Sequence, residues 1–97
     1  MKIEFAPAAQ TEFAAAARWY AKEAGAKYAR DFKNEIRRMI NLIVQYPDMG
    51  TKISGTARRL VATRFPYNII YQFDKSTLHI IAVAHQSRLP EYWKGRP

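Results

Sequence analysis

Three stretches in the second half of the chain alternate apolar and polar positions with a period of two, at residues 59–63, 67–73 and 78–84. This alternation, rich in β-branched and aromatic residues, is typical of half-buried β-strands. Residues 74–77 separate the last two stretches by a length that suits a tight antiparallel hairpin. Pro66 has no N–H to donate to a ladder, so we expect a corner or bulge between the first two strands.

The first half of the chain predicts a short strand followed by a helix. Residues 2–5 alternate polar and apolar side chains, as a strand does. Pro7 suits the first position of a helix, where its missing N–H costs nothing, and the alanines that follow favour helix as far as Ala24. Gly25 then ends the helix through a left-handed backbone conformation. An apolar stripe at helical spacing is formed by Phe13, Ala16, Ala17, Tyr20 and Ala24.

A second helix, over about residues 26–46, carries the strongest helical periodicity in the chain. Its apolar face consists of Tyr28, Phe32, Ile36, Met39, Ile40 and Ile43. Its polar face consists of Lys27, Arg30, Asp31, Asn34, Arg37, Arg38 and Asn41. Packing in a core accounts for the spacing of the aromatic residues better than a ligand site does. Pro47 and Gly50 stop the helix.

These elements together predict an α+β fold. Residues 49–57, with their glycines, threonines and serine, are interpreted as a loop, and the tail has room for a helical turn around residues 90–94. Helices followed by a run of strands are typical of α+β domains, not of parallel α/β sheets. We therefore expect a single domain over residues 1–97, in which an N-terminal αα-hairpin packs on an antiparallel β-sheet of three to four strands.

Charge is distributed unevenly along the chain. The net charge is +8, from 16 Lys and Arg against 8 Asp and Glu. Residues 1–48 hold eight bases and six acids, a net of +2, whereas residues 49–97 hold eight bases and two acids, a net of +6. A cationic sheet implies a partner with a negative surface, such as nucleic acid, a complex bound to nucleic acid, or an acidic protein. The alternative is a solvated basic surface without such a partner.

Several classes of protein are excluded by what the sequence lacks. No cysteine is present, which excludes disulfides and thiolate metal sites and fits a reducing compartment. No apolar run approaches the ~20 residues of a membrane span, and Glu4 lies where a signal peptide would turn apolar. We therefore expect a cytoplasmic protein with no membrane partner. Phosphate-loop, zinc-protease and serine-hydrolase motifs are absent, and we expect neither a cofactor nor a metal.

Candidate chemistry lies at the end of the last predicted strand. His79 and His85 are the only histidines, and their spacing of six residues would place them on the same face of a regular strand. His79 is interpreted as an ordinary strand residue. His85, Arg88 and Tyr92 offer a proton carrier, a phosphate-binding guanidinium and a hydroxyl donor, which could serve RNA cleavage by the 2′-hydroxyl. The alternative is that His85 only caps the strand and orients the tail.

Several short features follow one another along nearly the whole chain, and their order and spacing are more specific than any single motif. They are Pro7 opening an αα-hairpin, Tyr46-Pro47 with Gly50 after it, Arg58-Arg59, Arg64-Phe65-Pro66-Tyr67, Ile70-Tyr71, Val83-Ala84-His85-Gln86-Ser87-Arg88 and Glu91-Tyr92-Trp93. With these features the chain resembles the RelE/ParE superfamily, the toxins of bacterial type II toxin–antitoxin systems. The resemblance implies an αα-hairpin on an antiparallel sheet, in agreement with the periodicity.

The resemblance implies one of two activities. RelE-like members cleave messenger RNA in the ribosomal A site, whereas ParE-like members, including plasmid-stabilisation toxins, inhibit DNA gyrase without nuclease chemistry. RelE-like nucleases carry arginines at two places that are held here by Asn68 and Gln86, and an amide cannot neutralise a phosphorane as a guanidinium does. We therefore expect a ParE-like toxin. The alternatives are a RelE-like endoribonuclease, with His85, Arg88 and Tyr92 as catalytic residues, and a degenerate, non-toxic binding module.

The resemblance also implies partners. A small, acidic, partly disordered cognate antitoxin would neutralise the toxin and would link it to operator DNA, which the toxin reaches only through the antitoxin. The target would be DNA gyrase, or the ribosome with its messenger RNA. The residues expected to bind the target are Arg58, Arg59, Arg64, His85, Arg88, Tyr92 and Trp93.

Overall fold

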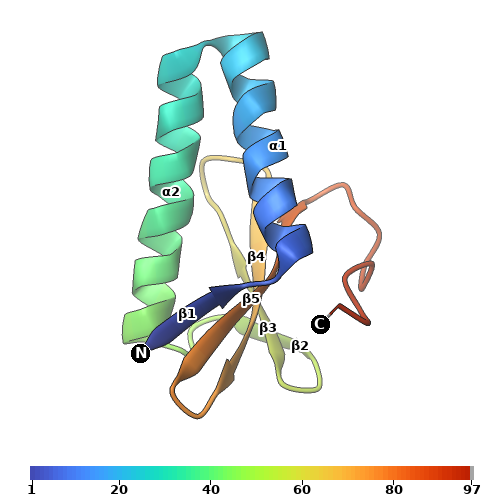
Figure 1. Cartoon of the computed structure of the whole chain (residues 1–97). Coiled ribbons are helices and arrows are strands. Elements are labelled where there is room, and N and C mark those ends of the chain that lie inside the picture. The colour runs from blue at the N-terminus through green and yellow to red at the C-terminus, as the bar shows by residue number, and fades with distance from the viewer. Residues whose placement is uncertain (97) are drawn as a thin grey trace.

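Two helices cover one face of a five-stranded sheet in the computed structural model, which describes residues 1–96 (Figure 1). The predicted α+β class and the αα-hairpin are confirmed. In chain order the elements are β1 (Lys2–Phe5), α1 (Pro7–Ala24), α2 (Ala26–Gln45), β2 (Thr51–Ser54), β3 (Ala57–Val61), β4 (Tyr67–Asp74) and β5 (Thr77–His85). No helix among the described residues is long and apolar enough to cross a membrane.

The sheet is mixed and larger than predicted. Its strand order is β1-β5-β4-β3-β2, and β1 runs parallel to β5 while all other pairs are antiparallel. The fifth strand, β2, lies in the stretch that was predicted to be a loop. Its sequence, Thr51–Ser54, is mostly polar because β2 is an edge strand with two exposed residues at its start, so it lacks the apolar alternation that marks a half-buried strand.

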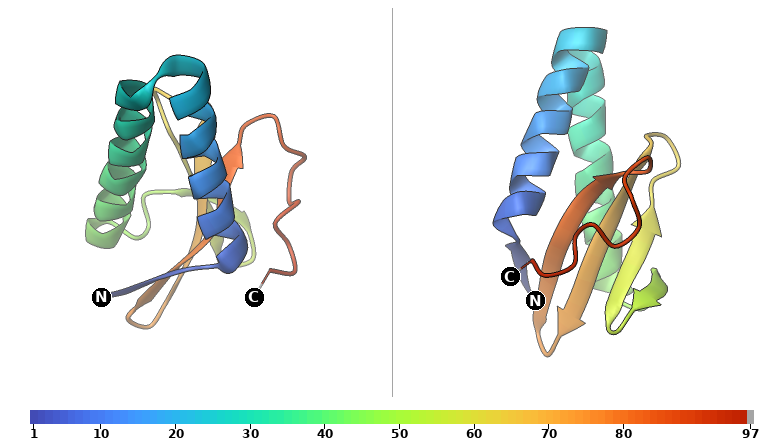
Figure 2. Two further views of the ribbon diagram at one scale, coloured as in Figure 1. Left: turned by 45° about the horizontal axis from the view of Figure 1, so that its top comes forward. Right: turned by 90° about the vertical axis from the view of Figure 1, so that its right-hand side faces the viewer.

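The helical hairpin packs on the sheet through the predicted face of α2. Phe32, Ile36, Met39 and Ile43 are at most 2% exposed and meet Ile69, Tyr71, Leu78, Ile80 and Val83 from the sheet. Tyr28, which was expected on the same face, is 41% exposed. It lies near the turn that joins the helices, and this turn projects beyond the sheet (Figures 1 and 2).

A bulge in β5 reverses which side chains face the helices. Ile70 pairs with Ala82 and Tyr71 pairs with Ile80, so Ile81 is an extra residue in β5. Ile80 and Val83 both belong to the core under the helices, whereas Ile81 and Ala82 belong to the apolar cluster on the opposite face. The expectation that His79 and His85 share a face is therefore wrong, because it assumed a regular strand.

The tail after β5 crosses the face of the sheet that the helices leave open (Figure 2). Trp93 anchors it and is 8% exposed among Ala57, Ile70, Ile81, Ala82 and Ala84. The tail forms consecutive turns and contains no helix over residues 90–94. Glu91, with a φ of 65°, has a left-handed conformation that interrupts any helical turn there.

Candidate target-binding groove

A hollow of the described surface lies between α1 and the tail, and we refer to it as the α1–tail groove. It is open to solvent and has a volume of about 610 Å³. Residues from α1, from the ends of β4 and β5, and from the tail line it: Glu12, Ala15, Ala16, Trp19, Tyr20, Pro66, Tyr67, Val83, His85, Ser87, Arg88 and Tyr92. Three residues predicted from the sequence, His85, Arg88 and Tyr92, are thus brought together.

Aromatic side chains line much of the groove. Trp19 is 58% exposed and meets Tyr20 edge-on, with 5.2 Å between ring centroids. Tyr67 lies directly across from His85 in the β4–β5 ladder, and their rings are 5.1 Å apart in an edge-to-face arrangement. An exposed tryptophan in a hollow is a common anchor for protein partners. Trp19 was missed in the sequence because its position is off the apolar stripe of its helix.

The ring of His85 is oriented by the turn that follows it. The backbone N–H of Ser87 donates to Nδ1 of His85 at 3.0 Å, and the Ser87 hydroxyl lies 2.7 Å from the same nitrogen. Because a backbone N–H can only donate, Nδ1 is the acceptor, and the neutral ring carries its proton on Nε2. In this arrangement neutral His85 has no free lone pair with which to accept a substrate proton.

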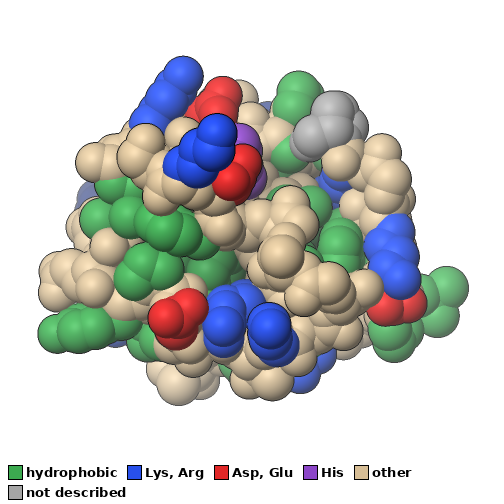
Figure 3. All heavy atoms as spheres, turned by 90° about the horizontal axis from the view of Figure 1, so that it is seen from below, with side chains coloured by type: hydrophobic (Ala, Val, Ile, Leu, Met, Phe, Trp, Pro, Cys, Tyr) green, Lys and Arg blue, Asp and Glu red, His purple; other side chains and the backbone are tan. Residues whose placement is uncertain are grey.

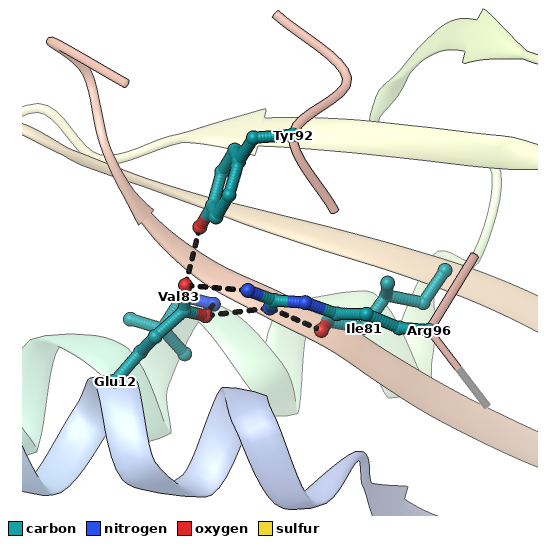
Figure 4. A network of polar contacts seen from close by, with 5 residues as sticks. All are labelled: Glu12, Ile81, Val83, Tyr92 and Arg96. Carbon is teal, nitrogen blue, oxygen red and sulfur yellow. Dashed lines mark hydrogen bonds and ion pairs between the residues drawn. The ribbon is translucent and has the colours of Figure 1, made fainter. Parts of the chain in front are cut away.

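Tyr92 belongs to a network centred on Glu12 (Figure 4). Its hydroxyl donates to Oε2 of Glu12 at 2.5 Å, and Arg96 donates to both carboxylate oxygens at 2.9 and 3.0 Å. Burial, and then the hydrogen bond and charge of Glu12, raise the pKa of Tyr92 well above its ordinary value. A tyrosine held in this way is a weak proton donor toward any other group.

Arg88 supplies a free positive charge at the rim. Its guanidinium lies over the ring of Tyr92, 4.2 Å from the centroid. Among residues 1–96, no carboxylate lies within ion-pair distance of Arg88. The groove therefore combines an apolar wall with a positioned cation, and its one carboxylate, Glu12, is neutralised by Arg96.

A second groove lies on the other side of the β5 end, between the open sheet face and the tail, and has a volume of about 370 Å³. Arg59, Asn68 and Gln86 line it, and His85 and Arg88 border both grooves. Nε2 of Gln86 donates to Oδ1 of Asn68 at 3.3 Å. The two amides that lie where the resemblance to RelE-like nucleases would require arginine are thus neighbours.

The remaining predicted residues are Arg58 and Arg64, which lie outside both grooves, and Trp93, which is largely buried. Arg58 donates to the carbonyls of Asp48 and Gly50 at 3.1 and 2.8 Å and so fixes the loop after α2. Arg64 pairs with Asp31 of α2 at 3.1 Å. Trp93 lines the second groove, but its burial at 8% leaves little surface for a partner.

Glu12, like Trp19, lines the α1–tail groove and was missed by sequence reasoning. The only local signal is a carboxylate in an alanine-rich helix, at a position next to the apolar stripe. Its partners lie about 70 to 84 positions away, so no local pattern predicts them.

Basic side chains do not form one continuous patch at the end of the molecule seen in Figure 3. Lys and Arg side chains appear there in several separate groups, interspersed with acidic and exposed apolar ones. On this face, therefore, the positive charge is not concentrated at one place.

The chain matches a family model described as ParE toxin of type II toxin–antitoxin system, parDE, over residues 3–90. Among solved structures, it is similar to a chromosomal ParDE toxin–antitoxin system from P. aeruginosa, with a TM-score of 0.76 and 16% sequence identity. That similarity covers 88% of this chain and 95% of the other, and at this identity it shows a shared fold. No match was found among curated proteins.

Proposed function

Because the chain belongs to the ParE toxin family of type II toxin–antitoxin systems, we propose that it inhibits growth by binding DNA gyrase and is held inactive by a cognate antitoxin. Gyrase as the target comes from the resemblance to the ParE-like branch. The antitoxin would be small, acidic and partly disordered, and would link the complex to operator DNA.

The observation that supports a binding function is the state of the two groups that would have to move protons. Nδ1 of His85 accepts the N–H of Ser87, and the hydroxyl of Tyr92 donates to Glu12. RNA cleavage needs an acceptor and a donor that can reach one scissile bond. The same residues need no free proton sites if they only present a shaped surface to a protein.

The proposed contact surface is the β5 end with its two grooves. Arg59, His85 and Arg88 lie there, beside the apolar wall that includes Trp19. Arg64 is partly exposed and contributes charge near the tip of the hairpin. Arg58 and Trp93 act indirectly in this proposal, because they hold the loop after α2 and the tail.

The ribonuclease alternative has one observation in its favour, which is that His85, Arg88 and Tyr92 do meet in one groove. It would require Tyr92 to leave Glu12 and His85 to change tautomer. In the third alternative, the protein is a non-toxic binding module that binds the antitoxin but no target.

A supercoiling assay with purified gyrase and the full chain tests the proposal. We expect inhibition that is abolished by the double variant Arg59→Glu/Arg88→Glu. The matched control is Arg30→Glu/Lys33→Glu, which changes the charge equally at two exposed positions of α2. His85→Ala should weaken inhibition by less than about tenfold, since loss of an essential proton carrier would cost ~10²–10⁴.

The other outcomes separate the alternatives. Codon-positioned cleavage of messages in a translating extract, lost in His85→Ala or Tyr92→Phe, would support the ribonuclease instead. Neither gyrase inhibition nor cleavage, together with tight binding of the antitoxin, would identify a non-toxic module.

A further inference from the structure

The carboxylate of Glu12 joins three segments that are far apart in the chain. Oε1 accepts the backbone N–H of Val83 at 3.0 Å and an N–H of Arg96 at 2.9 Å. Oε2 accepts the hydroxyl of Tyr92 and a second N–H of Arg96. One side chain of α1 thus binds β5 and the tail at the same time (Figure 4). We refer to Glu12, Val83, Tyr92 and Arg96, with Ile81, as the Glu12 network.

The network lies where the edge of β5 loses its neighbouring strand. β1 ends at Phe5, and the N–H of Ala6 still donates to the carbonyl of Ile80 at 2.9 Å. Beyond that point Glu12 accepts from Val83, and Arg96 donates to the carbonyl of Ile81 at 3.1 Å. Two side chains therefore supply the acceptor and the donor that a strand would have supplied, so these buried backbone groups are satisfied.

The tail depends on this network because it has little other polar attachment. At its start, the N–H of Gln86 donates to the carbonyl of Pro66 and the Gln86 side chain donates to Asn68. Beyond Gln86 its backbone hydrogen bonds are local turns, in which Arg88 donates to His85, Tyr92 to Leu89 and Arg96 to Trp93. Beyond Gln86, the packing of Trp93 and the Glu12 network attach the tail to other elements. Local segments held by so few contacts can open without global unfolding.

The same network fixes the free cation of the α1–tail groove. Two guanidinium groups lie over the ring of Tyr92, with Arg88 at 4.2 Å and Arg96 at 4.9 Å from its centroid. Glu12 accepts a hydrogen bond from the Tyr92 hydroxyl and so orients the Tyr92 ring. Arg88 packs on this ring, which fixes its position at the rim of the groove.

We propose that Glu12 is a positioning residue that fastens the C-terminal tail across the sheet and thereby fixes Arg88 at the rim of the α1–tail groove. The fastening role stands on the contacts alone, whereas the importance of Arg88 for the target rests on the proposed function. A charged pair with both partners about one-fifth exposed is sensitive to loss of either member, because the other is left uncompensated.

Fastening is tested on the full chain with Glu12→Gln, which keeps the shape and removes the charge. We expect cleavage by trypsin between Arg88 and Leu89 to accelerate by ~10-fold or more, and the Val83 amide to lose protection from hydrogen exchange. In a Trp19→Phe background, the emission of Trp93 should shift to the red. The matched control is Glu91→Gln, which removes an exposed tail pair with Lys94 and should leave cleavage within about twofold.

Arg96→Gln gives an independent test if Glu12→Gln does not fold. It should release the tail while Val83 keeps its protection, because the bond between Glu12 and Val83 is left in place. Tail cleavage within twofold of the unmodified chain in both variants would overturn the proposal, as would equal acceleration in Glu91→Gln.

A double-mutant cycle tests positioning. If Glu12 acts through Arg88, Glu12→Gln should weaken gyrase inhibition in the unmodified chain and add no further loss to Arg88→Ala. Additive losses would overturn the positioning role. Release of the tail with no change in inhibition would overturn the proposed target surface and leave the fastening role of Glu12 supported.

Discussion

Gln86 donates a hydrogen bond to Asn68, with 3.3 Å between Nε2 and Oδ1, across the ends of β5 and β4. These are the two places at which the resemblance to RelE-like nucleases would require arginine. Each amide is a partner of the other, so a neutral contact lies where a pair of guanidinium groups could have stabilised negative charge.

Restoring the arginines should not restore a nuclease. In Asn68→Arg/Gln86→Arg we expect no codon-positioned cleavage in a translating extract, because Nδ1 of His85 still accepts from Ser87 and Tyr92 still donates to Glu12. Messages mapped by primer extension provide the measurement, with circular dichroism as the check on folding. Cleavage in the double variant would mean that the amides alone suppress the activity.

Gly50 should not tolerate a side chain. A Cβ built there would lie 2.7 Å from the hydroxyl of Tyr71 and 3.0 Å from the carbonyl of Arg59. The N–H of Gly50 also donates to that hydroxyl, which in turn donates to the carbonyl of Pro47. Gly50→Ala should lower the free energy of unfolding by about 1–3 kcal/mol in urea titrations.

The control for that substitution is Gly55→Asn. Gly55 has a φ of 56°, a conformation that asparagine tolerates, and a Cβ there meets nothing within 4 Å. Equal stability of Gly50→Ala and the unmodified chain would contradict the close approach of Tyr71.

The two faces of α2 should respond differently to truncation. Ile36 is 1% exposed in the core, so Ile36→Ala should lower the free energy of unfolding by about 2–5 kcal/mol. Arg37 is exposed, and Arg37→Ala should stay within about 0.5 kcal/mol of the unmodified chain. Chemical denaturation of both variants measures these free energies. Similar losses in the two variants would show that the buried and exposed faces of α2 are assigned wrongly.

Stability should fall in alkali, and Tyr92 should account for part of the loss. Burial raises the pKa of Tyr20, Tyr67 and Tyr71, and burial together with Glu12 raises the pKa of Tyr92 most strongly. The unfolded chain therefore releases these protons first, so their stabilising effect is complete below about pH 10 and declines above it.

Tyr92→Phe should accordingly show a shallower decline in the free energy of unfolding above about pH 10, by up to about 1.4 kcal/mol per pH unit. Urea titrations between about pH 8 and 11 measure this slope. Tyr46→Phe, which removes a hydroxyl at a position that is 60% exposed, is the matched control. The same slope in both variants would contradict the raised pKa of Tyr92.

The complex with an acidic antitoxin should survive high salt. Exposed apolar side chains, such as Trp19 at 58% and Leu89 at 79%, offer surface to bury in addition to charge. We expect less than about tenfold weakening between ~0.15 and ~1 M salt, measured by calorimetry, because screening acts on the charged contacts only. Dissociation by ~1 M salt alone would show an interface that is mainly electrostatic.

The sequence by itself determined the features that depend on local periodicity. The buried face of α2 follows from apolar residues at helical spacing, and β4 and β5 follow from alternation on either side of a four-residue turn. Pro7 and Gly25 bound α1 because their backbone preferences act on the residue itself. The predicted assembly of His85, Arg88 and Tyr92 also followed from sequence proximity.

Only the tertiary structure decided the features that depend on distant partners. The bulge at Ile81 reversed the face of His85, and no local pattern announces where one extra residue enters a ladder. Strand β2 is stabilised by its pairing with β3, and β1 by its parallel pairing with β5 from the other end of the chain. Glu12 gains its role from groups up to 84 positions away, since hydrogen bonds and ion pairs depend on proximity in space and not on spacing along the chain.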